Sequence, residues 1–390
     1  MVLSYKQELG LRIAVDRYNH NQKYTVIAGY AGAGKSTLVR FIIEALHVPE
    51  EEVCFATFTG KAAQVLLKKG NMNVSTLHKL LYKSFPKADG TFVRIPVEEI
   101  PYKVVVVDEV SMAPKALMDL LFTYDVHIIC LGDPFQLPPI DKNDDNHLLD
   151  NPHIFLDEIM RQAQESEIIR LSMEIRQGLP IKEGHGNEVI ILSNSELNTG
   201  MLKWADQILC GTNAKRIDIN SQMRGLLGKV GEPQDGDKII CTRNYWDVCA
   251  DNEDPLINGT IGTLKNSFNS CNYIPKYMGG GKIDTVITDF IADSGSYFNK
   301  LEVDRTMFST GKPTLDWKTS FKLSKNPKTR NLIPLEFDYG YCITGHKSQG
   351  SEYEKVLVIE ERYPFDREEH LRWLYTCCTR ASEKLVLIKK

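Results

Sequence analysis

Short apolar runs recur along the first 150 residues and alternate with stretches that have helical spacing. Four runs are continuous and of strand length: Tyr24–Ala28, Val53–Thr57, Lys103–Val107 and His127–Leu131. Such runs are typical of parallel strands that are buried on both faces of a sheet. Helical periodicity marks Ser4–His20 and Lys35–Leu46. We therefore predict an α/β domain with helices layered on a parallel sheet.

A second α/β pattern begins near Leu156. Glu165–Gly178 has an apolar stripe at helical spacing and ends at a glycine, which is a common helix stop. Asp366–Arg380 also reads as a helix. The strands expected in this half are Gln207–Gly211, Lys238–Thr242, Lys355–Ile359 and Lys384–Ile388.

Two segments break the α/β pattern. Between 258 and 335 helical periodicity fades and short alternating runs appear, which predicts a small β-rich insertion. Within 79–100, Ala88-Asp89-Gly90 reads as a hairpin turn between Tyr82–Phe85 and Thr91–Ile95. The predicted layout is a first domain over 1–150 that contains the 79–100 hairpin. A second domain is expected over 151–257 and 336–390, with 258–335 inserted into it.

Composition adds little to this layout. The chain of 390 residues is 42% hydrophobic and 25% charged, which is ordinary for a globular protein of two or more domains. No apolar run approaches the about 20 residues that a membrane span needs, and the N-terminus is too polar for a signal peptide. We expect a soluble cytoplasmic protein with buried free thiols. The net charge of −4 counts mildly against a nucleic-acid protein.

The strongest chemical pattern is GYAGAGKS at 29–36, which lies between a predicted strand and a predicted helix. It fits the P-loop pattern GxxxxGK[ST], in which glycines and backbone N–H groups wrap phosphates. We expect Lys35 to reach the β- and γ-phosphates and Ser36 to bind Mg²⁺. Chance occurrence is the alternative, and the strand–turn–helix context weighs against it. The predicted ATP contacts are Gly29, Ala31, Gly32, Ala33, Gly34, Lys35, Ser36 and Thr37.

Two further polar segments follow apolar strands. Asp108 and Glu109 follow four valines, at the carboxyl edge where α/β sheets bind ligands. Asp108 would hold the Mg²⁺ and Glu109 would activate water, unless the pair is only an acidic loop. Gln136 follows the next strand and would sense the γ-phosphate. Taken alone, that segment reads better as a proline-rich loop.

The order of these segments resembles the superfamily 1 helicases, in the RecD/Dda-like branch that moves 5′ to 3′. GYAGAGKST, DEVSM and GDPFQLPP stand in the order of that family's first three motifs. ATFTGKAA at 56–63, STLH at 75–78, MRQ at 160–162, TGHKSQGSE at 344–352 and LYTCCTRA at 374–381 resemble other segments of that family. Gly345 and Phe58 depart from the usual pattern, and no charged catalytic position does.

The resemblance implies a fold and a set of nucleotide contacts. The fold would be two RecA-like domains in tandem, with a pin-like hairpin in the first and an SH3-like β insertion in the second. Gln7 would read adenine, while Gly350 and Glu352 would lie at the nucleotide. Arg161 and Arg380 would reach the γ-phosphate from the second domain. Each arginine alone would read as an ordinary surface residue.

The resemblance also implies a track for single-stranded DNA. The residues expected along it are Thr57, Phe58, Thr59, Lys61, Thr76, His78, Phe85, Phe92, Thr212, Asn213, Asn258, His346 and Lys347. For the aromatic residues a packing role is an equal alternative, and Asn258-Gly259 also reads as a simple turn.

The function that follows is an ATP-dependent 5′-to-3′ DNA helicase using ATP and Mg²⁺. The alternatives are a single-strand translocase without strong unwinding and a non-motor nucleotide switch. We expect single-stranded DNA and fork junctions as partners, no membrane, and a monomer. Single-strand-binding and replication proteins are further candidate partners.

Overall fold

A computed structural model describes residues 3–86, 92–138, 145–160, 165–251, 255–361 and 366–390. The chain folds as two compact units. The first comprises residues 1–83, 95–211 and 344–390, and the second comprises 84–94 and 212–343. The helices in the described part of the chain are all too short or too polar to cross a bilayer.

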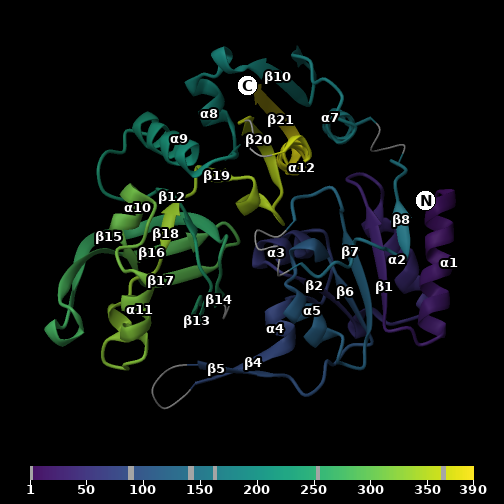
Figure 1. Cartoon of the computed structure of the whole chain (residues 1–390), viewed down its shortest axis with the longest axis horizontal. Helices are drawn as coiled ribbons and strands as arrows, with labels where there is room; N and C mark the ends of the chain where they lie inside the picture. Colours follow the sequence, from purple (N-terminus) through teal and green to yellow (C-terminus); the bar gives the residue numbers. More distant parts are fainter. Residues whose placement is uncertain (1–2, 87–91, 139–144, 161–164, 252–254, 362–365) are drawn as a thin grey trace. The chain divides into compact units, whose positions relative to one another are not determined.

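The first unit contains a six-stranded parallel sheet formed by its N-terminal part (Figure 1). Its strand order is β3 (Val74–Thr76), β2 (Val53–Thr57), β6 (Val104–Val107), β7 (His127–Gly132), β1 (Tyr24–Gly29) and β8 (Ile154–Leu156). Consecutive valines of β6 face opposite sides, so both faces of the sheet are buried. The predicted parallel sheet is therefore confirmed.

Helices cover both faces of this sheet. α1 (Tyr5–Asn19) and α2 (Lys35–Leu46) pack on the face that carries Val104 and Val106. α4 (Leu77–Leu81) and α5 (Lys115–Leu121) pack on the face that carries Val105 and Val107. α3 (Gly60–Lys68) lies between β2 and β3 in the chain and contacts both strands.

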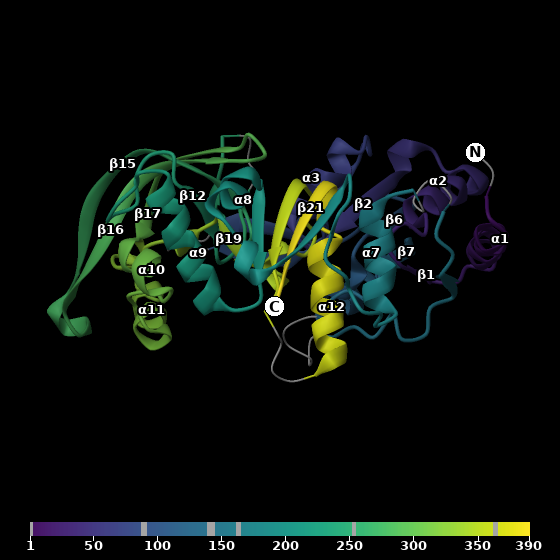
Figure 2. The same cartoon turned by 90° about the horizontal axis from the view of Figure 1, so that it is seen from above.

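A second sheet of the first unit contains the C-terminal strands (Figure 2). Its order is β19 (Cys342–Thr344), β11 (Gln207–Cys210), β20 (Tyr353–Ile359), β21 (Ala381–Lys389), β10 (Val189–Ser193) and β9 (Gly184–His185), and β9 is antiparallel to β10. The helices of this part are α7 (Glu167–Arg176), α8 (Thr199–Trp204) and α12 (Arg367–Cys378). α7 and α12 match the two predicted helices to within two residues at each end.

The second unit is built on an antiparallel sheet. Its order is β17 (Tyr297–Asp304), β16 (Gly281–Ala292), β15 (Ile261–Ile274), β12 (Lys238–Cys241) and β18 (Phe337–Tyr339). A β13–β14 pair (Tyr245–Cys249, Pro255–Leu256) and the helices α9 (Asn213–Leu226), α10 (Arg305–Thr310) and α11 (Trp317–Ser324) complete it. β19 (Cys342–Thr344) leads the chain back into the first unit.

One strand assignment was wrong. Lys238–Thr242 was expected in the second α/β domain, but β12 pairs antiparallel with β15 and β18. An isolated apolar run has no feature that distinguishes a parallel partner from an antiparallel one. The predicted domain boundaries as a whole stay a prediction.

The 79–100 segment contains two paired strands. β4 (Tyr82–Pro86) and β5 (Phe92–Pro96) form a sheet of their own. Most of this pair is grouped with the second unit, as residues 84–94. The predicted turn at Ala88-Asp89-Gly90 lies outside the described residues.

Candidate ATPase site

The P-loop joins β1 to the start of α2. Gly32 and Gly34 have φ angles of 76° and 78°, in the left-handed region that a side chain disfavours. A Cβ on Gly34 would lie 2.5 Å from Nε2 of Gln7 and 3.1 Å from Cγ of Met160. The loop therefore needs glycine at this position for both its backbone angle and its close packing.

Lys35 lies folded against its own loop. Its ammonium group donates to the carbonyl oxygens of Gly29 at 2.7 Å and Tyr30 at 3.1 Å. Hydrogen bonds between two charged groups are stronger than those to neutral carbonyls. The Lys35 ammonium group can therefore leave these carbonyls and bind a phosphate instead.

Ser36 and Asp108 line a single cavity of about 620 Å³ in the first unit. A hydroxyl and a carboxylate that face one space are the oxygen ligands that Mg²⁺ takes in P-loop proteins. These two residues therefore fit the predicted metal ligands.

Gln7 contacts the P-loop rather than standing apart from it. The residue is fully buried, its amide oxygen accepts from the Ser4 amide at 3.0 Å, and its Nε2 donates to the Gly34 carbonyl at 3.4 Å. The Ser4–Gln7 pair forms the capping box of α1. This contact gives Gln7 a structural role, and its role toward adenine stays a prediction.

The two carboxylates that follow β6 have different environments. Oδ1 of Asp108 accepts from the Glu109 amide at 2.9 Å. Burial raises the pKa of Glu109, with a smaller contribution from the charge of Asp108, and the Arg380 guanidinium opposes this rise. Its Oε2 is buried and has no hydrogen-bond partner among the described residues. A buried carboxylate with an unused oxygen can accept a proton from a bound water.

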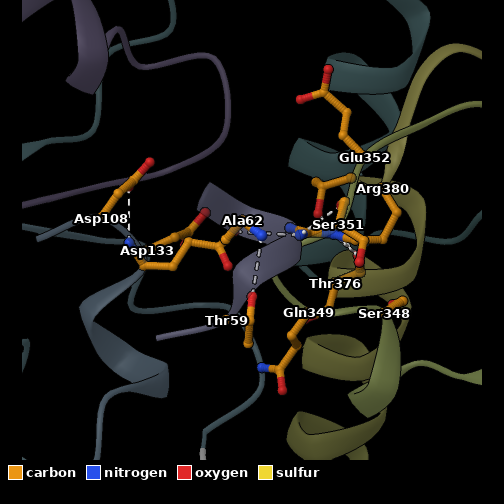
Figure 3. Close-up of polar contacts among 12 residues, drawn as sticks. Thr59, Ala62, Asp108, Asp133, Ser348, Gln349, Ser351, Glu352, Thr376 and Arg380 are labelled. Carbon is orange, nitrogen blue, oxygen red and sulfur yellow. Dashed lines mark hydrogen bonds and ion pairs between the residues drawn. The ribbon is translucent and has the colours of Figure 1, made fainter. Parts of the chain in front are cut away.

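Arg380 follows α12 in the chain, and its side chain lies beside that of Glu109. Figure 3 shows Arg380 together with Ser351 and Thr376. Arg380 is 5% exposed. Its Nε donates to the Thr376 carbonyl at 3.1 Å, and Nη1 donates to the Ser351 carbonyl at 3.2 Å. Nη1 also lies 3.4 Å from Oε1 of Glu109. The backbone contacts fix the guanidinium beside the carboxylate.

Gly350 packs directly against the Glu109 carboxylate. Its φ is 70°, and a Cβ there would lie 3.2 Å from Oε2 of Glu109 and 2.9 Å from Oγ1 of Thr59. The glycine thus lets the 344–352 segment approach both the carboxylate that follows β6 and the N-terminus of α3.

Hydrogen bonds also join the loop after β7 to the 344–380 region. Nε2 of Gln349 donates to the Leu137 carbonyl at 2.6 Å, and the Leu137 amide donates to Oγ1 of Thr376 at 3.0 Å. The neighbouring Gln136 has a buried side-chain oxygen without a hydrogen-bond partner in the described parts of the chain.

Tyr375 connects the P-loop to the same region. Its hydroxyl accepts from the Ala31 amide at 2.8 Å and donates to Oδ2 of Asp133 at 2.5 Å. Burial raises the pKa of Tyr375 well above its usual value, so the hydroxyl stays protonated. Sequence reasoning assigned no role to Tyr375, Asp133 or Gln349, although all three lie within segments that it singled out.

The comparisons with known proteins agree with this geometry. An AAA domain family model matches residues 11–188, and a UvrD-like helicase C-terminal domain model matches 339–388. Together the two models cover more than half of the chain. The ATP-dependent RecD2 DNA helicase of Deinococcus radiodurans is 25% identical over 93% of this chain and 46% of its own length. The ATP-dependent DNA helicase dda of phage T4 is 28% identical over 47% of this chain and 46% of its own length.

Solved structures give the same fold. A Pif1 helicase structure at forked double-stranded DNA covers 100% of this chain and 92% of that chain, with a TM-score of 0.52 and 17% identity. Bacteroides Pif1 in complex with ADP-AlF3 and single-stranded DNA covers 99% and 92%, with a TM-score of 0.52 and 16% identity. The chain is thus similar to the RecD2 and Dda helicases in sequence, and its fold resembles that of the Pif1 helicase structures. It spans about half the length of the RecD2 and Dda relatives.

Several of the threonines expected on the DNA track have structural roles. Thr59, Thr76 and Thr212 are N-caps whose hydroxyls accept from the backbone amides of Ala62, Lys79 and Lys215. The Thr57 hydroxyl donates to the Thr59 carbonyl. These contacts explain why threonine stands at each position, and the DNA contacts remain predictions.

The other track residues of the first unit are also engaged in protein contacts. Phe58 packs against the sheet core, with its ring 5.8 Å from that of His78. Nζ of Lys61 donates to the Tyr353 hydroxyl at 2.7 Å. Burial lowers the pKa of His346, and its neighbour Lys347 lies in the same short 3₁₀ turn.

The remaining predicted site residues are distributed over both units, and one of them lies outside the described residues. Glu352 forms a partly exposed ion pair with Lys69 at 2.9 Å, away from the P-loop lysine. Thr212, Asn213 and Asn258 belong to the second unit. Phe85 and Phe92 lie on β4 and β5. Thr37 lies in the first turn of α2. Arg161 lies outside the described residues.

Proposed function

We propose that this chain is an ATP-driven motor that moves 5′ to 3′ on single-stranded DNA and unwinds duplex DNA. The observation that carries the proposal is the meeting of Glu109 with Arg380 at 3.4 Å beside the P-loop. The two side chains are 271 residues apart in the sequence, so opening or closing this contact would couple hydrolysis to movement of one segment against the other. The names of the RecD2 and dda relatives support DNA as the track.

In this proposal the P-loop amides and Lys35 hold the phosphates of ATP, and Ser36 and Asp108 hold Mg²⁺. The metal, when bound, neutralises phosphate charge. Glu109 accepts the proton of the attacking water, since its Oε2 is unused and its pKa is raised by burial. Gln136 senses the γ-phosphate by donating from its side-chain amide N–H group, and Arg380 stabilises the charge that develops on the phosphate.

The path from hydrolysis to DNA runs through Gly350. Gly350 lies close to both Glu109 and Thr59, so a movement of the Glu109 carboxylate would displace Gly350 and, through it, the N-terminus of α3. Thr59 and Lys61, at that terminus, belong to the proposed DNA track. The hydrogen bonds of Gln349 and Thr376 with Leu137 add a second connection, between the 344–380 region and the loop after β7. Single-strand backbone contacts of this kind suit movement that does not depend on sequence.

A non-motor nucleotide switch is the alternative function. A switch has no need of a second sheet that contributes an arginine to the hydrolysis site. ATP hydrolysis measured with and without single-stranded DNA separates the two: a motor needs strong stimulation by DNA, and equal rates would support the switch.

We predict that the β4–β5 hairpin separates the strands. An aromatic side chain that replaces base stacking contributes about 1–3 kcal/mol, against about 1.4 kcal/mol for an average DNA step. A Phe85→Ala/Phe92→Ala double variant should therefore keep DNA-stimulated ATP hydrolysis and single-strand translocation and lose unwinding. A fork-unwinding assay measures this effect.

The control for the hairpin variant is Glu98→Ala, an exposed position just beyond β5. It should unwind normally. If the double variant loses hydrolysis, translocation and unwinding together, the phenylalanines pack the hairpin instead. If it unwinds at the normal rate, the hairpin is not the wedge.

A further inference from the structure

The short helix α11 of the second unit is anchored on one side and exposed on the other (Figures 1 and 2). Its N-cap Asp316 accepts from the Thr319 amide at 2.7 Å. Leu323 is fully buried in a small cluster with Ile283 and Leu315. These contacts hold the helix in place without using its outer residues.

The outer face of α11 carries a stacked column of side chains. Trp317 and Phe321 are 71% and 45% exposed, and their rings lie 5.2 Å apart with an interplanar angle of 12°. Nζ of Lys325 lies 4.3 Å from the Phe321 ring centroid. The spacing of four residues places all three side chains along one stripe of the chain. Phe321 is the one ring partner of Trp317 among the described residues, so the column ends at Trp317.

The same segment is strongly basic. Lys318, Lys322, Lys325 and Lys328 are all exposed, and no acidic residue occurs between Trp317 and Leu335 in a chain whose net charge is −4. None of these four lysines forms an ion pair within the described residues.

Some other cations of this unit pair with nearby acids. Lys282 and Arg305, for example, both pair with Asp284. The acid that immediately precedes α11, Asp316, is occupied as the helix cap. Although the charge of Asp316 also acts on Lys318, the α11 surface is a basic patch with an aromatic end.

We propose that α11 binds single-stranded DNA, with a base stacked on Trp317 and backbone phosphates on Lys318 and Lys322. Exposed aromatic rings beside lysines are the chemistry that recognises unpaired bases and their phosphates together. A duplex hides its base faces, and an acidic protein would use the lysines but not the open ring face. This inference rests on the proposed function, because it assumes that the chain binds single-stranded DNA. It adds a DNA contact in the second unit.

The test is binding of a fluorescent oligothymidylate to the full chain, measured by anisotropy. Trp317→Ala should weaken binding by about 5- to 50-fold, because stacking on one base is lost. Trp317→Phe keeps a stacking face and should recover most of the affinity. Lys318→Ala/Lys322→Ala should reduce the slope of log affinity against log salt by about 1.4, from about 0.7 for each phosphate contact. The control is Tyr5→Ala, an aromatic residue that is 76% exposed in the first unit.

Each variant is first compared with the unsubstituted chain in thermal unfolding and in ATP hydrolysis without DNA, both of which should be unchanged. Unaltered oligothymidylate affinity in Trp317→Ala and an unaltered salt slope in the lysine variant would overturn the proposal. Equal loss of affinity for a blunt duplex would contradict base stacking on Trp317. If the unsubstituted chain binds no single-stranded DNA, the proposed function itself fails, and this result is distinct from the others.

Discussion

Glu109→Gln should lower ATP turnover by about 10²- to 10⁴-fold and leave ATP binding intact. The amide has the size and shape of the carboxylate, so packing against Gly350 and Arg380 is kept. It has no basic oxygen to take the proton of the attacking water. Steady-state hydrolysis, together with binding of a fluorescent ATP analogue, separates the two effects.

The pH profile gives a second check on Glu109. Its pKa is raised by burial, so the carboxyl becomes protonated, and inactive as a base, at a higher pH than an exposed glutamate. The acidic limb of kcat/KM should thus lie above the ordinary glutamate range, with activity lost as pH falls. Glu51→Gln, at an exposed glutamate, is the matched control. Near-normal turnover in Glu109→Gln would refute the assignment of the base.

Arg380→Ala should reduce DNA-stimulated turnover by about 10³- to 10⁵-fold, the range known for arginine fingers. The guanidinium is buried, is held by two backbone carbonyls and has the Glu109 carboxylate within reach. Nucleotide affinity should change by no more than a few-fold, because the P-loop holds most of the phosphate contacts. Single-turnover hydrolysis with saturating single-stranded DNA measures the loss.

The alanine variant also leaves Glu109 without its cation, and breaking a buried pair is destabilising. Arg380→Lys therefore accompanies it, since lysine keeps the charge but not the forked geometry, and should recover only part of the rate. The matched control is Arg367→Ala, at an exposed arginine at the start of α12. An unchanged DNA-stimulated rate in a folded Arg380→Ala variant would contradict the finger.

The P-loop and the parallel sheet could be predicted because their signals are local. Buried strands read as apolar runs, and the carboxylates that follow β6 read as a ligand edge. α9 was missed for the opposite reason. Its buried face mixes the apolar Ile219 and Met223 with the polar Arg216, Asn220 and Arg224, so its hydrophobic stripe is interrupted. Asn220 alone bonds three backbone groups of Tyr339 and Cys342, which only the fold reveals.

The close contacts of the site were beyond sequence reasoning as well. The spacing of residues does not show that Gly350 touches Glu109 or that Tyr375 bonds Ala31 and Asp133. The threonines of the predicted DNA track have a recognisable sequence pattern, but that pattern fits two different roles. A helix cap and a phosphate contact select the same residue type, so the pattern alone does not separate them.

Unwinding of tailed duplexes tests the central proposal most directly. The full chain is given two substrates with the same duplex, one with a 5′ single-stranded tail and one with a 3′ tail, and strand release is followed by fluorescence. The account predicts ATP-dependent release from the 5′-tailed substrate, little from the 3′-tailed one, and none with Lys35→Ala. Preferential release from the 3′-tailed substrate would contradict the polarity, and the absence of release from both, despite DNA-stimulated hydrolysis, would contradict unwinding.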